Sequence, residues 1–292
     1  MDTTQLKTPY HRKPNWIRTD RSILDPEVAV AGKLLKQRGI KTVCKEAACP
    51  NRSECWRNRS FTFILMGSHC TRMCPFCNID ATTPDPLDPD EPNRIARFVN
   101  DYTINHCVIT SVTRDDLPDG GADHFCKTIT ALRKVSPDLP LELLIPDFGQ
   151  WSAFDEVIAM RPAVLGHNIE TVERLYPVAR PQYKYGRCLE ILSYCKSKSP
   201  SLPIKSAILV GLGETADEIR SAMRDLREAA CDIVYIGQYL APSKRHLPVE
   251  KYYTPEEFLS FQTYATQIGF TGCVAGPLVR SSYRSWQTLK SV

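Results

Sequence analysis

From Phe61 onward, short apolar runs rich in β-formers alternate with longer amphipathic segments. The runs expected as strands are 61–66, 107–111, 141–145, 164–166, 206–210 and 233–236. The helices expected between them lie near 94–100, 122–134, 153–160, 171–176, 187–196 and 216–230. Continuous apolar strands joined by helical crossovers are typical of a parallel sheet covered by helices. Six such units predict an α/β protein with a partial (βα)6 barrel, although the pattern alone also permits an open doubly wound sheet.

The ends of the chain do not follow this alternation. We therefore expect an N-terminal extension at 1–60, a barrel at 61–275 and a C-terminal tail at 276–292. Within the barrel, the four prolines and the acidic residues of Thr83–Pro92 predict an extended surface loop. A threonine followed by proline opens the amphipathic segment Thr254–Ile268, which predicts one more helix.

The composition is ordinary for a globular protein, with 42% hydrophobic and 24% charged residues. The longest apolar runs, Phe61–Leu65 and Ala207–Val210, are far shorter than the ~20 residues of a membrane helix. Residues 1–21 are polar and basic and lack the apolar stretch of a secretory signal. We therefore expect a soluble, cytoplasmic protein that does not bind membranes.

The net charge of +4 is too small to indicate nucleic acid binding. Basic residues nevertheless outnumber acidic ones near the start of the chain, where a solvated tail and a docking arm for an acidic partner are both open interpretations. The basic residues concerned are Lys7, Arg12, Lys13, Arg18 and Arg21.

Twelve cysteines in a chain without an export signal favour metal or redox chemistry over disulfides. Cys70, Cys74 and Cys77 form a C-x-x-x-C-x-x-C motif directly after the first expected strand. Three thiolates on one loop can each bind one iron of a four-iron cluster, and the fourth iron is then open to a small molecule. A zinc ion is the alternative to an iron–sulfur cluster, and His69 next to the motif could be a zinc ligand. However, no further Cys or His follows at the spacing of a zinc finger.

A second group of three, Cys44, Cys49 and Cys55, precedes the barrel. Taken by themselves, these three cysteines could simply be buried thiols. Because the chain also has a first cluster motif, a second metal site is the better interpretation. Its last iron would need another ligand, and Ser281 or Ser282 offers a hydroxyl. The remaining six cysteines lack ligand-like spacing and are expected to be small core residues. They are Cys107, Cys126, Cys188, Cys195, Cys231 and Cys273.

With both cysteine triads in view, the chain resembles the lipoyl synthase family of radical S-adenosylmethionine (SAM) enzymes. The resemblance covers nearly the whole chain. It is carried by Arg12–Trp16, Lys41–Trp56, Thr62–Cys77, Asp116–Phe125, His167–Pro181, Gly211–Thr215, His246–Val249 and Gly276–Tyr283. Small departures occur at Lys45, at Gly149-Gln150, at Cys188 where serine is commoner, and at Ala241, and none is a cluster ligand.

This resemblance implies a partial barrel of the radical SAM type and an enzyme of lipoate biosynthesis and protein lipoylation. A 4Fe–4S cluster on Cys70, Cys74 and Cys77 would bind SAM, whose reductive cleavage gives a 5′-deoxyadenosyl radical. The radical would abstract hydrogen from carbons 6 and 8 of an octanoyl chain. An auxiliary 4Fe–4S cluster on Cys44, Cys49, Cys55 and a serine would then donate sulfur, with Ser282 preferred over Ser281 and the tail closing over it.

The resemblance also implies partners and SAM contacts. The substrate would be an octanoylated lipoyl-carrier protein, either a glycine-cleavage H protein or a 2-oxoacid dehydrogenase lipoyl domain, and ferredoxin or flavodoxin would donate electrons. Each expected SAM contact also has an ordinary structural explanation, such as helix capping for Asn168. The expected contacts are Phe76 beside the adenine, Thr110 at the end of the second strand with Asp116 on the loop after it, Asn168 and Glu170 at the ribose hydroxyls, and Arg180 near a carboxylate.

Two other classes remain open. Another radical SAM sulfurtransferase, such as a methylthiotransferase or biotin synthase, would lack the terminal Arg280–Tyr283 motif. An iron–sulfur electron carrier would usually supply four cysteines per cluster. Residues 120–121 and 211–214 could approach a ligand with their glycines or merely form turns.

Overall fold

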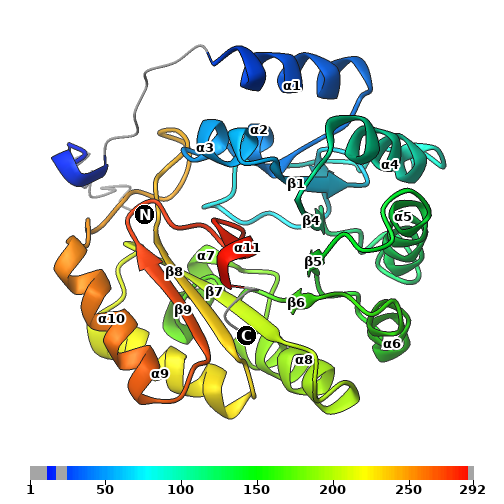
Figure 1. The fold of residues 1–292 in the computed structure, drawn as a ribbon. Coiled ribbons are helices and arrows are strands. Elements are labelled where there is room, and N and C mark those ends of the chain that lie inside the picture. The colour runs from blue at the N-terminus through cyan, green and yellow to red at the C-terminus, as the bar shows by residue number, and fades with distance from the viewer. Residues whose placement is uncertain (1–11, 18–24, 289–292) are drawn as a thin grey trace, which may run out of the picture.

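A computed structural model of the chain describes residues 12–17 and 25–288 (Figure 1). Seven parallel strands form its main sheet in the order β1-β4-β5-β6-β7-β8-β9. They are β1 Ser60–Leu65, β4 His106–Ser111, β5 Leu141–Leu144, β6 Val164–Gly166, β7 Ile204–Val210, β8 Ile233–Gln238 and β9 Gly272–Gly276. The strand order follows the chain, whereas a doubly wound sheet reverses its order at a switch point. The open doubly wound alternative is therefore wrong and the partial barrel is confirmed.

All six expected strands are present, and β9 adds a seventh at the far edge of the sheet. In the described residues β1 pairs in this sheet only with β4, and β9 only with β8, so the barrel is open between β1 and β9. A separate two-stranded sheet joins β2 His69–Cys70 to β3 Asp80–Ala81.

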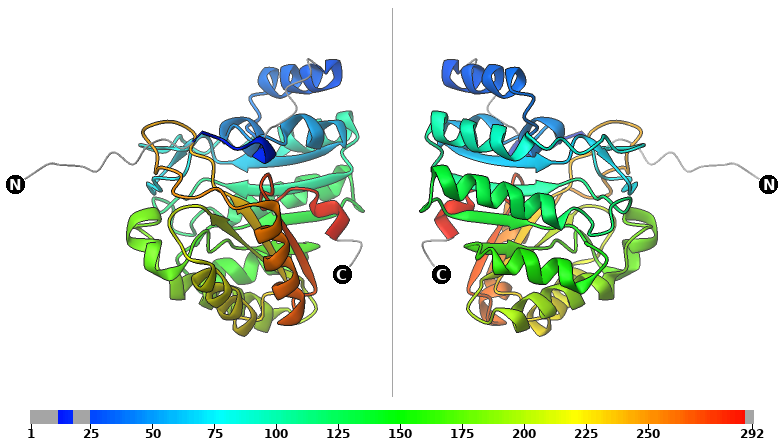
Figure 2. Two further views of the ribbon diagram at one scale, coloured as in Figure 1. Left: turned by 90° about the vertical axis from the view of Figure 1, so that its left-hand side faces the viewer. Right: turned by 90° about the vertical axis from the view of Figure 1, so that its right-hand side faces the viewer.

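The helices lie around the outside of the strands (Figures 1 and 2). The expected helices are confirmed except the one near 171–176, where a 3-10 turn precedes a short helix that begins at Tyr176. Pro92, which was expected in the surface loop, instead occupies the first turn of α4, where its missing N–H costs nothing. Thr215 and Thr254 form capping boxes with Glu218 and Glu257 at the starts of α9 and α10. The helices are α4 Glu91–Tyr102, α5 Ala122–Val135, α6 Trp151–Ala159, α7 Tyr176–Ala179 after the 3-10 turn η2 Glu173–Leu175, α8 Tyr185–Lys198, α9 Ala216–Glu228 and α10 Pro255–Gln267.

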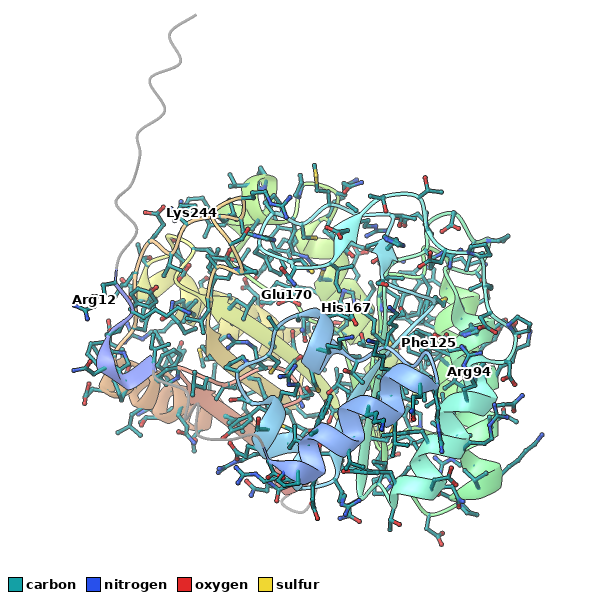
Figure 3. All side chains as sticks on the ribbon, turned by 90° about the horizontal axis from the view of Figure 1, so that it is seen from above. Arg12, Arg94, Phe125, His167, Glu170 and Lys244 are labelled. Atoms are coloured by element: carbon teal, nitrogen blue, oxygen red, sulfur yellow. The ribbon has the colours of Figure 1, made fainter. Side chains whose placement is uncertain are left out.

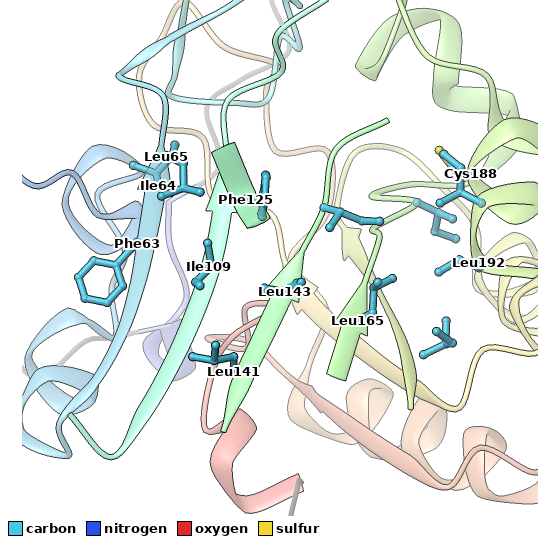
Figure 4. Packing of buried hydrophobic residues seen from close by; sticks show 14 of the residues in the cluster. Phe63, Ile64, Leu65, Ile109, Phe125, Leu141, Leu143, Leu165, Cys188 and Leu192 are labelled. Carbon is cyan, nitrogen blue, oxygen red and sulfur yellow. The ribbon is translucent and has the colours of Figure 1, made fainter. Parts of the chain in front are cut away.

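Strand β1 is buried at every position and anchors the core (Figure 4). The Phe61 ring stacks on Trp56 at a centroid distance of 5.3 Å and meets Phe98 of α4 edge-on at 5.5 Å. Burying one such side chain is worth roughly 1.5–3 kcal/mol. Because Trp56 belongs to the N-terminal extension, this contact joins the extension to the barrel.

The extension lies along the free edge of β1, and the tail follows β9 and packs against β7 and β8. The extension comprises η1 Asn15–Ile17, α1 Pro26–Gln37, α2 Val43–Glu46 and α3 Arg52–Arg57, and the tail ends in α11 Ser285–Thr288. Ile64 N–H donates to the Lys41 carbonyl at 3.1 Å, so the extension runs along the free edge of β1. Asn51 Nδ2 donates to the Leu278 carbonyl at 2.6 Å, which joins the extension to the tail. The three-part division of the chain stays a prediction. No described helix has the length and apolar character needed to span a membrane.

Candidate active site

A cavity of about 330 Å³ lies at the C-terminal ends of the barrel strands. Small-molecule sites have volumes of about 300 to 1,000 Å³, and barrel enzymes place theirs at this end. Eight of the thirteen predicted site residues line it: Cys70, Cys74, Phe76, Cys77, Thr110, Asn168, Glu170 and Arg180. His167, Arg280 and Ser281 also contribute to the wall, and Figure 3 shows His167 and Glu170 in the interior of the barrel.

Backbone groups hold the loop of Cys70, Cys74 and Cys77, hereafter the loop triad. The Cys70 thiol accepts the N–H groups of Arg72 at 3.4 Å and Thr113 at 3.3 Å. The guanidinium of Arg180 interacts with the thiol of Cys74. Burial raises the pKa of Cys74 to about 11 and that of Cys77 to about 12. The free thiols of Cys74 and Cys77 are therefore protonated at neutral pH, and a metal must displace their protons.

The donor set fits a four-iron cluster better than a single ion. In the part of the chain that the structure describes, no three Cys, His, Asp or Glu side chains converge on one metal ion. Zinc needs such convergence, whereas a four-iron cluster takes one thiolate on each of three separate irons. Three thiols on one loop, all facing one cavity, meet the second requirement.

Several polar atoms on the cavity residues have no partner. Ser111 Oγ, His167 Nε2 and Arg180 Nε are buried and have no hydrogen bond in the structure. An unsatisfied buried polar atom costs about 1–3 kcal/mol, so these atoms indicate a site for a polar ligand. Glu170 has a left-handed φ of 64°, a backbone strain of the kind that clusters at functional sites. Its carboxylate accepts from Asn168 Nδ2 at 2.9 Å.

Other expected contacts are placed differently. Asp116 does not line the cavity, because Arg114 holds its carboxylate with two hydrogen bonds of 2.8 Å. Thr110 Oγ1 donates to the Leu144 carbonyl at 2.7 Å. A Cβ on Gly120 would lie 2.7 Å from the Phe148 backbone, so packing accounts for this glycine and a ligand is not needed. Glu214 accepts the N–H groups of residues 211 and 212, which identifies 211–214 as an internal turn.

Cys44, Cys49 and Cys55, hereafter the extension triad, lie on and between α2 and α3. Burial and the neighbouring Cys44 raise the pKa of Cys49 to about 11. Burial also raises the pKa of Cys55, and Cys44 and Cys49 add to the increase, so the three thiols are neighbours. Thr62 interacts with the Cys44 thiol.

The structure separates the two candidate serines. Thr62 Oγ1 donates to Ser282 Oγ at 2.9 Å, so Ser282 lies beside the extension triad, whereas Ser281 lines the cavity of the loop triad. Between the triads, Arg280 lines the cavity and its charge interacts with Cys49 and Glu170. Val43 and Ala47, which flank Cys44, also line the cavity. The loop triad therefore lines the cavity, and the extension triad lies behind the part of the wall formed by Val43 and Ala47.

Sequence reasoning did not single out Tyr183. Its ring lies between two guanidinium groups, 4.2 Å from that of Arg72 and 3.8 Å from that of Arg180. Its hydroxyl is 2.8 Å from Thr113 Oγ1. Nothing in the spacing signals this sandwich, because it joins two loops more than one hundred residues apart.

Comparisons with known proteins show which family the chain belongs to. The sequence model of the Radical SAM superfamily matches residues 64–226. A lipoyl synthase of Mycobacterium ulcerans (strain Agy99) is 47% identical over 286 residues, which cover 98% of this chain and 87% of the relative. A lipoyl synthase of Mycolicibacterium paratuberculosis (strain ATCC BAA-968 / K-10) is also 47% identical over 286 residues, which cover 98% of this chain and 92% of the relative.

Solved structures resemble the chain in fold. Methylornithine synthase (PylB) superposes with a TM-score of 0.56 at 16% identity, covering 82% of this chain and 74% of that one. The [FeFe]-hydrogenase maturase HydG superposes with a TM-score of 0.54 at 11% identity, covering 77% of this chain and 58% of that one. With the match to curated relatives over almost the whole chain, the expectation from the motifs is confirmed: this chain belongs to the lipoyl synthase family of radical SAM sulfurtransferases.

Proposed function

We propose that this chain inserts two sulfur atoms, at carbons 6 and 8, into an octanoyl group on a lysine of a lipoyl-carrier protein, using SAM and two 4Fe–4S clusters. One observation carries the proposal: the cavity that the loop triad lines is also walled by Val43 and Ala47, next to Cys44 of a second cysteine triad. A plain electron carrier needs no such cavity, and a SAM enzyme without an auxiliary cluster needs only one triad.

In this proposal Cys70, Cys74 and Cys77 hold the cluster that binds SAM. A reduced cluster with an open iron supplies the electron that cleaves SAM. Arg180 places a cation beside Cys74 and near the carboxylate of SAM. Asn168 and Glu170, already joined by a hydrogen bond, present an amide and a carboxylate to the ribose hydroxyls.

The other expected contacts have narrower roles. Phe76 supplies an apolar face for the adenine from within the loop triad. Thr110 acts through the carbonyl of Leu144, to which it is bonded. Asp116 acts indirectly, since it fixes Arg114 in the loop after β4.

Cys44, Cys49, Cys55 and Ser282 would hold the auxiliary cluster, the source of sulfur. The support is the position of Ser282, whose Oγ is bonded to Thr62 beside Cys44. Val43 and Ala47 give the cavity an apolar wall next to this triad, which suits an acyl chain. The sulfur of the auxiliary cluster would then reach the carbons of the octanoyl chain without passing through solvent.

The carrier would be a glycine-cleavage H protein or a 2-oxoacid dehydrogenase lipoyl domain. Arg12 and Lys13 are exposed and suit an acidic carrier, and Trp16 Nε1 ties this segment to the Tyr253 carbonyl at 3.1 Å. The other basic residues of the expected arm, Lys7, Arg18 and Arg21, lie outside the described residues. Ferredoxin or flavodoxin would donate electrons. The twelve free cysteines suit the reducing cytoplasm.

The test is turnover of an octanoylated carrier by the reconstituted enzyme with SAM and a reductant. Mass spectrometry of the carrier peptide should show two hydrogens replaced by two sulfurs, together with 5′-deoxyadenosine. SAM cleavage with a methylated product instead would indicate a methylthiotransferase. No SAM cleavage by a protein that carries reduced clusters would indicate an electron carrier.

A further inference from the structure

One buried cysteine outside both triads has polar neighbours. Cys188 of α8 is only 1% exposed (Figure 4). Its Sγ lies 3.4 Å from Arg180 Nη1 and 3.5 Å from Tyr176 Oη, and it interacts with the ring of His167. A cysteine that serves only as a small core residue would be surrounded by apolar groups, so this environment calls for another explanation.

Arg180 needs an acceptor at this place. It is 6% exposed, and its Nη1 donates to the carbonyls of Asn168 at 3.0 Å and Ile169 at 3.3 Å. Among the described residues no ion pair joins a carboxylate to its guanidinium, although the charge of Glu170 interacts with it. Arg72, on the other side of the Tyr183 ring, has Asp115 at 2.6 Å. A buried cation without an anionic partner is costly, and the sulfur of Cys188 occupies the place that a carboxylate takes beside Arg72.

His167 faces the same sulfur. Its Nδ1 lies 2.9 Å from the Ile145 carbonyl, and because a carbonyl only accepts, Nδ1 must carry the hydrogen. Nε2 has no hydrogen bond in the structure, and the interaction of the ring with the Cys188 thiol is electrostatic. Burial opposes ionisation of the thiol, but His167 and Arg180 outweigh it and lower the pKa of Cys188 to about 7.

We propose that Cys188 is a positioning residue whose sulfur fixes Arg180 behind the cavity, and that Arg180 is thereby held against Cys74 and the SAM site. The proposal rests on the SAM-binding function proposed above. The contacts from Cys188 to Arg180 and from Arg180 to Cys74 form one continuous chain from α8 to the loop triad.

Cys195, seven residues further along α8, supplies a matched control. It is equally buried, at 0% exposed, and burial raises its pKa to about 12. Unlike Cys188, it has no guanidinium or imidazole neighbour among the residues that the structure describes. Its thiol is a core residue, as the sequence predicts.

The experiment measures equilibrium SAM binding to the reconstituted enzyme, from the change in the electron paramagnetic resonance spectrum of the reduced cluster. Cys188→Ser keeps a hydrogen-bonding group and should bind SAM within about twofold of the wild type, whereas Cys188→Val should bind roughly tenfold more weakly. Cys188→Ala, which cannot overpack the site, should behave like the valine variant. Cys195→Val should leave SAM binding unchanged, and Cys195→Ser should lower the melting temperature without changing SAM affinity.

Wild-type affinity in the valine and alanine variants, at equal iron content, would overturn the proposal. Equal losses in the serine and valine variants would also overturn it, because the hydroxyl retains the hydrogen bond to Arg180. Failure of the wild type itself to bind SAM would instead contradict the proposed function.

Discussion

The two triads differ in how the chain assembles them. The loop triad comes from one stretch, 70–77, whose sulfurs are held by nearby backbone N–H groups and face an open cavity. The extension triad comes from two short helices, and Ser282 reaches it through Thr62, 220 residues away in sequence. A locally built site can leave one position open for a ligand, whereas a site completed by a distant tail is closed until the tail moves. This difference fits a site that binds SAM and a site that stores sulfur.

The largest effect should follow loss of a loop ligand. Cys74→Ala removes one of three thiolates, and formation of 5′-deoxyadenosine should fall to background because SAM has no cluster iron to bind. Chromatography of the nucleoside product measures this. Cys126→Ala, on α5 and outside both triads, is the control and should retain cleavage. A Cys74→Ala enzyme that still cleaves SAM would remove the loop triad from its assigned role.

Loss of an extension ligand should separate the two activities. Cys49→Ala should still cleave SAM but should give no thiolated carrier, because only the sulfur source is damaged. The nucleoside and the carrier peptide are measured in the same reaction. A folded Cys49→Ala protein that contains the first cluster yet cleaves no SAM would show that the division of labour is wrong.

The serines offer a finer comparison. Ser282→Ala should reduce sulfur insertion by about tenfold or more, because the extension triad loses its oxygen ligand. Ser281→Ala, one residue away but facing the cavity, should retain sulfur insertion and the iron of both clusters. Iron analysis and carrier mass spectrometry distinguish the two variants, and equal behaviour would refute the assignment of Ser282.

The smallest effect concerns the attachment of the tail. Glu54 accepts from Tyr283 Oη at 3.1 Å and pairs with Arg284 at 2.6 Å, with both charged side chains partly exposed. Such pairs contribute about 0.2–1 kcal/mol, so Glu54→Gln should speed loss of the second cluster to a chelator no more than about fivefold. Asp123→Asn, which breaks an exposed pair on α5, should leave the rate unchanged. A rate increase in Asp123→Asn as large as that in Glu54→Gln would show that the tail contact is not the cause.

Much of the fold follows from local sequence patterns. The strands are continuous apolar runs, and Thr254 with Pro255 signals a helix start that the capping box confirms. Strand β9 is less visible because it is half-buried, only five residues long and has glycine at both ends. Pro92 was assigned to a loop because it belongs to a proline-rich run, although a first helical turn accepts proline equally well.

From spacing alone, without the family resemblance, the site could be predicted only where ligands are neighbours in sequence. Cys70, Cys74 and Cys77 share a loop, so their spacing alone indicates a cluster. The Thr62–Ser282 hydrogen bond and the contacts of Cys188 depend on which surfaces pack together, and no short-range pattern records that. Asp116 differs, because its partner is close in sequence: it follows the end of a strand, as expected, but Arg114, two residues earlier, binds its carboxylate and keeps it from the cavity.

The central claim is that the chain holds two separate clusters, and iron with acid-labile sulfide tests it most directly. Three proteins are purified and reconstituted without oxygen: the wild type, the Cys70/Cys74/Cys77→Ala variant and the Cys44/Cys49/Cys55→Ala variant. Two independent sites predict about eight irons per chain in the wild type and about four in each variant, with matching sulfide. About four irons in the wild type, or complete loss of iron from either folded variant, would contradict the claim.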